Sequence, residues 1–209
     1  MNRTKKTEKH EIANQIKDIS LRRNSIIIGT LILIAYCTIS ILFIELLTIV
    51  LLLELISGAA VIGAAFLLFP ILKPYNKILT FGYTIIKTIE GIFIIIAAIL
   101  LFPLIINPET SSILIFETRD WIYDTVILYL FGMRFLILAY ILYQSELVPR
   151  FISVWGIISS SIMIVASLIN LMTGTTVIPF IISHLPVISN EIFLAIWLMV
   201  KGFNEDAIT

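Results

Sequence analysis

The stretch YTIIKTIEGIFIIIAA, residues 83–98, places two ionisable side chains inside a long apolar segment. Lys87 and Glu90 lie about one turn of an α-helix apart. The apolar segment around them is longer than the roughly 20 residues that a membrane-spanning helix needs. The stretch therefore predicts a transmembrane helix. Each charge inside it would cost about 2.5–3.5 kcal/mol on membrane-insertion scales, so the pair requires a physical explanation.

The composition extends this prediction to the rest of the chain. Of the 209 residues, 59% are hydrophobic and 13% are charged, against roughly 25% charged residues in a soluble domain. A chain of this size cannot bury so many apolar side chains in a soluble core, so we expect a lipid bilayer around it. The formal net charge of zero provides no basic field for nucleic acid, and the single cysteine, Cys37, excludes a disulfide within this sequence.

Six apolar segments are long enough to cross a bilayer, which predicts an all-α integral membrane bundle of six transmembrane helices. Residues 25–209 would form this membrane domain, and residues 1–24 would form a cytoplasmic tail. In the tail, isoleucines at intervals of three and four favour either an amphipathic helix on the membrane surface or a solvated basic segment, and we favour the latter. The predicted spans are Ser25–Leu47, Ile49–Leu72, Ile78–Phe102, Trp121–Tyr143, Phe151–Met172 and Val177–Val200.

Two connections and two sets of small residues complete the predicted architecture. A tight turn near Glu45 to Val50 should join the first two spans, and residues 103–120 should form a polar connection whose ILIF patch lies in the membrane interface. Small residues four positions apart allow helix backbones to approach closely in lipid. Such pairs are Ala59 with Gly63, Ala60 with Ala64, and Gly156 with Ser160.

The basic residues predict how the chain is oriented in the cytoplasmic membrane. Of the 14 Lys and Arg residues, 11 fall on one side of the predicted spans, and only Arg119 falls on the other. Cytoplasmic segments carry the excess of Lys and Arg, so both termini are predicted to be cytoplasmic. The 11 residues are Arg3, Lys5, Lys6, Lys9, Lys17, Arg22, Arg23, Lys73, Lys77, Arg150 and Lys201.

Ionisable residues well inside the predicted spans are few. Lys87 and Glu90 belong to the third span, Arg134 to the fourth and Glu191 to the sixth. At a rise of roughly 1.5 Å per residue, they lie roughly 14–18 Å from the predicted cytoplasmic side, near the middle of a hydrocarbon core about 30 Å thick. Two are positive and two are negative. We therefore predict that these four residues form one buried midplane cluster, in which Arg134 contacts Glu90, Glu191 or both.

The midplane cluster has three interpretations. The one we favour is an ion-pair network that fixes the arrangement of the helices. The second is a site for a small molecule or ion, or part of its path in a transporter, as intramembrane charges often indicate. The third is a membrane-embedded enzyme or a sensory module that acts on lipid or on a protein partner. Glu54, Asp124 and His184 are predicted near the outer ends of their spans, within reach of water, where they would contribute to such a site.

The sequence contains no strong enzyme motif. HExxH, GxSxG, GxGxxG and P-loop patterns are absent, and the two histidines, His10 and His184, form no metal-binding pattern. Ser183 and His184 are adjacent, and adjacent residues of a helix point apart, so they are not expected to act as nucleophile and base. We assign no catalytic residue, metal ligand or cofactor, and we favour a protein without enzymatic activity.

Three stretches carry a family resemblance: LKPYNKILTFGYTIIKTIEG at 72–91, LAYILYQSELVPRFISVWGII at 138–158 and NEIFLAIWLMVKGFN at 190–204. They resemble a family of bacterial and archaeal membrane proteins catalogued as domain of unknown function 4386. The resemblance covers most of the chain from Leu52 onward. It implies a multi-pass membrane protein with no established activity, substrate or cofactor. It directs attention to Lys87, Glu90 and Glu191, whereas Arg134 departs from the family pattern.

Overall fold

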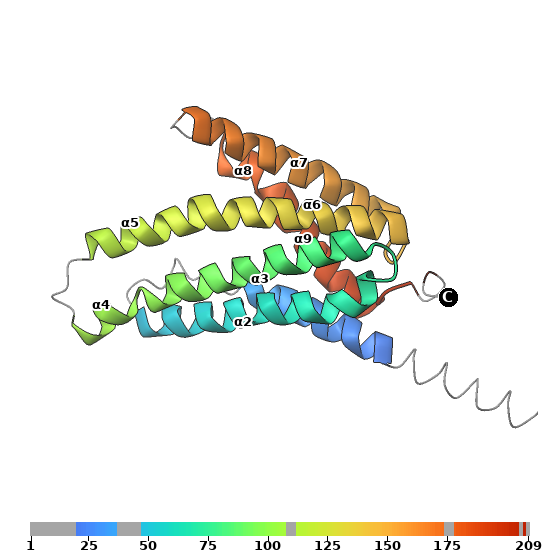
Figure 1. The fold of residues 1–209 in the computed structure, drawn as a ribbon, viewed down its shortest axis with the longest axis horizontal. Helices are drawn as coiled ribbons and strands as arrows, with labels where there is room; N and C mark the ends of the chain where they lie inside the picture. The colour runs from blue at the N-terminus through green and yellow to red at the C-terminus, as the bar shows by residue number, and fades with distance from the viewer. Residues whose placement is uncertain (1–19, 37–46, 108–111, 174–177, 205–206, 208–209) are drawn as a thin grey trace, which may run out of the picture.

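The computed structural model describes residues 20–36, 47–107, 112–173, 178–204 and Ala207 (Figure 1). These residues are almost entirely helical, and no strand occurs among them. The all-α prediction is therefore confirmed for the described part of the chain. Most of the predicted tail, residues 1–24, and the start of the tight turn predicted near Glu45 to Val50 lie outside the described residues. The rest of that turn prediction is wrong, because Leu47 to Val50 are the first residues of helix α2 (Leu47–Leu72).

The described residues form a succession of helices of very different lengths. The first covers residues 20–35. A π-helical segment, Ile122–Ile127, joins α5 to α6 without a break in the chain's helical course. The labelled helices are α2 (Leu47–Leu72), α3 (Lys77–Ile99), α4 (Phe102–Ile106), α5 (Ile113–Trp121), α6 (Leu128–Ser145), α7 (Arg150–Thr173), α8 (Phe180–Ser183) and α9 (Leu185–Val200).

Four described stretches of helix are long and apolar enough to cross a membrane. The last apolar helix, α9, has 16 residues, fewer than the roughly 20 that a straight span needs. The described residues therefore support four of the six predicted spans, and the first and sixth spans stay predictions. The four stretches are Leu47–Leu72, Lys77–Ile106, Ile113–Ser145 and Arg150–Thr173.

The connection predicted at residues 103–120 is mostly helical, and that prediction is wrong. Helix α4 follows α3 closely and extends the apolar stretch to Ile106, and α5 begins at Ile113 and continues into the π-helical segment and α6. Pro103 does not prevent a helix here, because it lies in the first turn of α4, where a backbone N–H has no helical partner. The ILIF patch forms the start of α5, and its place in the membrane interface stays a prediction.

The sixth predicted span is interrupted at His184, between α8 and α9. Pro186 lies in the first turn of α9. Proline has no N–H to donate to the preceding turn, and inside a helix its ring clashes with the carbonyl group of the residue four positions earlier. The proline therefore explains why α9 begins as a new helix at Leu185 and why it is short.

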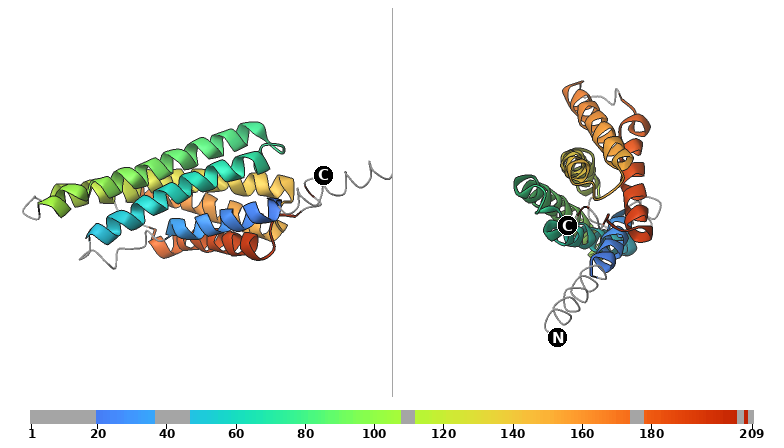
Figure 2. Two further views of the ribbon diagram at one scale, coloured as in Figure 1. Left: turned by 90° about the horizontal axis from the view of Figure 1, so that it is seen from below. Right: turned by 90° about the vertical axis from the view of Figure 1, so that its right-hand side faces the viewer.

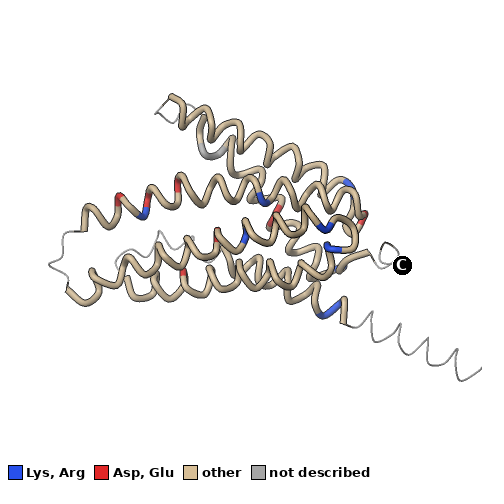
Figure 3. Tube along the Cα trace, viewed as in Figure 1, with Lys and Arg blue, Asp and Glu red and all other residues tan. Residues whose placement is uncertain are grey.

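The long helices lie side by side, with α2 against α3, α3 against α6, α6 against α7, and α7 against α9 (Figures 1 and 2). The α2–α3 turn, the α6–α7 loop and the end of α9 lie at the same end of the bundle. We call this the basic end, because most described Lys and Arg residues are found there (Figure 3). By their positions in the chain these are Arg22, Arg23, Lys73, Lys77, Arg150 and Lys201.

Helices α2 and α3 come into backbone contact at two glycines. A Cβ added to Gly58 would lie 2.9 Å from the carbonyl oxygen of Gly91, and a Cβ on Gly91 would lie 2.9 Å from that of Gly58. Only glycine permits an approach this close. The predicted contact pair was Ala59 with Gly63, and Ala59 is one position away from Gly58. Ala59 is exposed, and a Cβ on Gly63 would make an ordinary 3.4 Å contact with Leu31.

The other predicted small residues are buried, and Gly156 among them lies in a helix contact. Ala60 and Ala64 are buried on α2. A Cβ on Gly156 would lie 2.9 Å from the Cβ of Ala139, which confirms Gly156 as a contact position between α7 and α6. A further contact was not predicted: Gly29 of the first helix lies against the backbone of α9.

Candidate functional site

Helix α3 presents polar side chains to the interior of the bundle. Its buried polar residues recur every three or four positions, which places them on one face of the helix. Isoleucines on its other faces are exposed, as expected for a surface in contact with lipid. The buried polar residues of α3 are Thr80, Tyr83, Thr84, Lys87 and Glu90.

Arg134, on α6, joins carboxylates from two other helices. Its Nε contacts Oε2 of Glu90 on α3, and its NH2 lies 3.3 Å from Oε1 of the same residue. On the other side its NH1 and NH2 donate to Oε1 and Oε2 of Glu191 on α9, at 2.8 and 3.2 Å. The planar guanidinium thus binds both carboxylates through pairs of hydrogen bonds, which arginine can do and lysine cannot.

Three further side chains complete the surroundings of these charges. Lys87 Nζ lies 3.6 Å from Oε1 of Glu191. Tyr36, the last described residue before α2, donates its hydroxyl to Oε2 of Glu191 at 2.7 Å. The ring of Phe131 stacks on Arg134, with 4.5 Å between the guanidinium carbon and the ring centroid. Cation–π contacts of this kind add to the stabilisation of a charge that is removed from water.

The structure brings the four residues of the midplane cluster together. Arg134 contacts both Glu90 and Glu191, and Lys87 is paired with Glu191. All four residues are at most 3% exposed. Two cations and two carboxylates cancel, so the cluster is neutral as a whole. Neutralisation and satisfied hydrogen bonds are what allow charges to remain buried where water cannot reach them.

A second buried ion pair lies on α2 and α5. Arg119 NH2 and NH1 donate to Oε1 and Oε2 of Glu54 at 2.7 and 3.0 Å, and NH1 also contacts the carbonyl oxygen of Ala97 on α3. Its guanidinium carbon lies 5.7 Å from the ring centroid of Tyr123, one turn further along the chain. We call these two residues the Glu54–Arg119 pair.

The Glu54–Arg119 pair corrects two predictions. Glu54 was expected within reach of water, but it is 3% exposed and is paired with Arg119 rather than with the midplane cluster. Arg119 was expected in a polar loop, but it is a buried residue of α5. Both errors have one cause. Once residues 113–121 are helical, Arg119 has to lie beside the apolar helices, and it needs a carboxylate there.

Asp124 and His184, the other two residues predicted near the outer ends of their spans, are not members of the midplane cluster. They differ in exposure. Asp124 is exposed, on the π-helical segment. His184 is buried at the break between α8 and α9, with Nδ1 2.6 Å from the hydroxyl of Ser183. The expectation that these adjacent side chains point apart is wrong, because it assumed a continuous helix. Among the described residues, no three His, Cys, Asp or Glu side chains are grouped to hold a metal ion.

The sequence did not lead us to predict two residues of these buried networks, Tyr36 and Arg119, for different reasons. Tyr36 is a polar aromatic residue in the middle of the first predicted span, so its hydroxyl signalled a buried partner. Arg119 gave no such signal, because the segment around it contains prolines, serines and acidic residues that are typical of a loop.

Comparison with known proteins identifies the family but no activity. Neither the curated proteins nor the solved structures contain a match. The family described as "Domain of unknown function (DUF4386)" matches residues 43–202, which include all four residues of the midplane cluster and the Glu54–Arg119 pair. The match begins before Leu52, where the sequence resemblance was placed, and it also includes the segment between α3 and α6. The chain therefore belongs to the DUF4386 family of domains of unknown function.

Proposed function

We propose that this chain is a six-span protein of the cytoplasmic membrane with both termini in the cytoplasm, and that its midplane cluster holds the helices in one arrangement. The observation that carries the proposal is that Arg134, on α6, binds two carboxylates at once, those of Glu90 on α3 and Glu191 on α9. Tyr36 adds the end of the first helix to the same network. One arginine thereby links elements from across the whole described chain.

The saturation of the carboxylates favours this structural role over ligand binding. Both oxygens of Glu90 are bound by Arg134. For Glu191, Oε1 is shared by Arg134 and Lys87, and Oε2 is shared by Arg134 and Tyr36. A solute or ion would have to displace one of these partners, and stranding a buried charge costs about 3–5 kcal/mol. The network is therefore suited to holding helices and poorly suited to exchanging ligands.

A small-solute or ion site is the second candidate, and one observation favours it. Thr80 Oγ1 and Tyr83 Oη are buried and have no hydrogen-bond partner among the described residues. Both lie on the same face of α3 as Lys87, on the side toward the basic end. Buried oxygens without a partner are positions where water or a solute would be stabilised. A path from the basic end to Lys87 would follow this face.

Water access to Thr84 distinguishes the two candidates. Thr84 is a buried residue of this face and is similar in size to cysteine. In a Cys37→Ala background, Thr84→Cys should resist a membrane-impermeant thiol reagent in the folded protein and should react after denaturation in SDS. Asn76→Cys, in the α2–α3 turn, is the matched control and should react in both states. Reaction of Thr84→Cys in the folded protein would favour the solute path and contradict the structural role.

The orientation is tested separately with the same chemistry. In the Cys37→Ala background, single cysteines at Asn2, Asn76 and Thr209 should be protected from the impermeant reagent in intact cells, and one at Thr110 should be labelled. The prediction follows from the 11 basic residues on one side of the spans. Labelling at Asn76 together with protection at Thr110 would reverse the orientation and leave the network proposal unaffected.

A further inference from the structure

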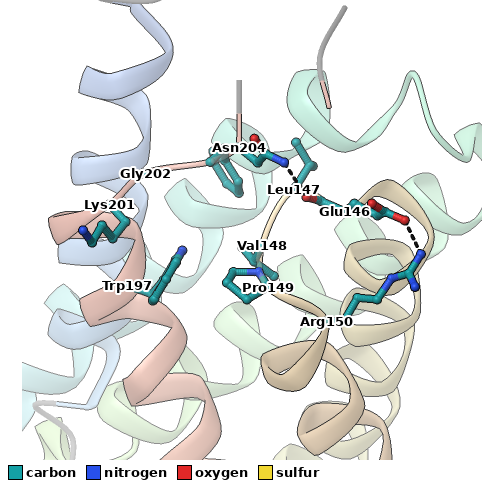
Figure 4. A pocket seen from close by; sticks show the side chains of 10 residues that line it. Glu146, Leu147, Val148, Pro149, Arg150, Trp197, Lys201, Gly202 and Asn204 are labelled. Atoms are coloured by element: carbon teal, nitrogen blue, oxygen red, sulfur yellow. Dashed lines mark hydrogen bonds and ion pairs between the residues drawn. The ribbon is translucent and has the colours of Figure 1, made fainter. Parts of the chain in front are cut away.

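A pocket of about 390 Å³ opens at the basic end, between the α6–α7 loop and the end of α9 (Figure 4). It is separate from the midplane cluster and shares no residue with it. Its walls are formed on one side by Leu147, Val148 and Pro149, and on the other by Trp197 and Lys201. Residues far apart in the sequence thus form a single concave site.

Two unusual backbone conformations build this pocket. Glu146 ends α6 in the left-handed region, with φ of 54°, and Gly202 ends α9 with φ of 81°. Gly202 turns the chain so that the N–H of Asn204 donates to the carbonyl oxygen of Leu147 at 2.8 Å. A non-glycine residue in the left-handed region is costly, and such positions are concentrated at functional sites. The loop and the end of α9 are therefore held together by specific bonds.

The described residues that line the pocket carry a net positive charge. The carboxylate of Glu146 is already paired with Arg150, one helical turn away. Lys201 is exposed, and its side chain forms no ion pair or hydrogen bond with the described residues. Arg22 lies behind Gly202 and donates to the carbonyl oxygens of α9 rather than to a carboxylate. Among the described residues, no carboxylate therefore pairs with the positive charges of Lys201 and Arg22.

An aromatic surface leads from the pocket along α7 and α9. The ring of Phe151 is 6.5 Å from that of Trp197 and 5.8 Å from that of Phe193, and Trp155 is 6.1 Å from Phe193. Phe151 and Phe193 are exposed at 55% and 37%. These exposed rings lie on helices that are apolar outside the bundle, so lipid acyl chains are their expected neighbours.

We propose that this pocket binds the phosphate-bearing headgroup of an anionic phospholipid, with an acyl chain lying on the Phe151–Phe193 surface. Lys201 supplies the charge, and Trp197 supplies an apolar wall with an indole N–H donor. Basic pockets between membrane helices are a recurring means of binding anionic headgroups. The proposal rests on the membrane location of the chain but on neither its orientation nor the role of the midplane cluster.

The aromatic surface favours a lipid over a soluble phosphate compound. The aromatic surface is contiguous with Trp197 at the pocket wall, so it would be of no use to a ligand that lacks an acyl chain. The two walls of the pocket belong to residues 138–158 and 190–204. They are bridged there by a bond between Asn204 and the carbonyl oxygen of Glu146, at 3.4 Å.

The test is a titration of the detergent-solubilised full chain with phosphatidylglycerol or phosphatidylcholine, followed by native mass spectrometry. Phosphatidylglycerol should bind more tightly than phosphatidylcholine. Lys201→Gln should weaken its binding about fivefold, the contribution expected of one Lys near an anionic surface. Lys201→Arg should retain binding. Lys77→Gln removes one positive charge from the same end outside the pocket and should leave the affinity unchanged. Thermal unfolding of each variant verifies that it is folded.

Three outcomes would overturn the proposal. Equal affinity for the two lipids would show that the headgroup charge is not recognised. Equal losses in Lys201→Gln and Lys77→Gln would show that only the general charge of the basic end matters. In a third arm, inorganic phosphate is added to the lipid-free protein, with Trp197 as the single fluorescent indole after Trp121→Phe and Trp155→Phe. A response to phosphate without displacement by phosphatidylglycerol would assign the pocket to a soluble phosphate compound instead.

Discussion

The midplane cluster and the Glu54–Arg119 pair use the same chemistry in two different ways. In each, an arginine binds glutamate through two hydrogen bonds, and an aromatic ring lies near the guanidinium. The cluster shares one arginine between two carboxylates and adds Lys87 and Tyr36. The Glu54–Arg119 pair joins one arginine to a single carboxylate. The cluster therefore links more helices, and its loss should affect the bundle more widely.

The midplane cluster and the Glu54–Arg119 pair also differ in how their charges are neutralised. The Glu54–Arg119 pair is neutral by itself, whereas Arg134 alone cannot neutralise both of its carboxylates and depends on Lys87. Removing one member of the pair strands one charge. Removing Arg134 leaves two carboxylates facing one lysine. The comparison thus predicts a graded set of losses, which mutations can test.

Arg134→Met should have the largest effect. It should lower the free energy of unfolding by about 3–5 kcal/mol, because it strands a net negative charge inside the bundle. Combining it with Glu191→Gln or Glu90→Gln should recover part of this loss, because the charge balance is restored. Unfolding in mixed micelles with increasing SDS would measure both. Arg150→Met is the control: its ion pair is exposed, so stability should not change. Additive losses in both double variants would contradict the pairing.

Arg119→Met should cost about 3 kcal/mol, at the lower end of the same range, because it strands only one carboxylate. Arg119→Met with Glu54→Gln should be closer to the unmodified protein than either single variant. The same SDS titration applies. If Arg119→Met were more damaging than Arg134→Met, the Glu54–Arg119 pair and not the cluster would be the principal link between helices.

The backbone contact between α2 and α3 connects the two regions, because Gly58 lies one turn from Glu54 and Gly91 follows Glu90. Gly58→Ala should cost about 2 kcal/mol, since its Cβ would meet the backbone of Gly91 and the side chain of Ile95. Gly63→Ala is the matched control and should be nearly neutral. The melting temperatures of the two variants in detergent would measure the difference, and equal values would place the contact elsewhere.

Tyr36→Phe should have the smallest effect, about 1.5 kcal/mol, because it removes one hydrogen bond to a carboxylate that keeps its two cations. Tyr129→Phe provides the comparison. It removes a 2.8 Å bond to the uncharged carbonyl oxygen of Ser167, so it should cost less. Thermal unfolding of both variants tests this order. A larger loss in Tyr129→Phe would mean that Tyr36 adds nothing to the cluster.

The midplane cluster was predictable from sequence because depth along a helix follows directly from residue number. Lys87, Glu90, Arg134 and Glu191 had to lie at similar depth once their spans were located, and buried charges have to find partners. The face of α2 that contacts α3 was not predictable to one residue, which is why Gly58 and not Gly63 makes the closest approach. Alanine and glycine surround both positions, and the pattern of small residues is compatible with more than one face.

The sequence by itself determined that this is an apolar all-helical chain, where most of its long helices run, and that four charges of balanced sign would meet. Those properties depend on composition and on the fixed rise of a helix. Only the tertiary structure decided that Glu54 binds Arg119, that Ser183 meets His184, and that the α6–α7 loop closes on the end of α9 to form a pocket. These contacts depend on how helices are rotated, broken and joined, which is set by packing across the whole bundle and is not encoded in any single stretch.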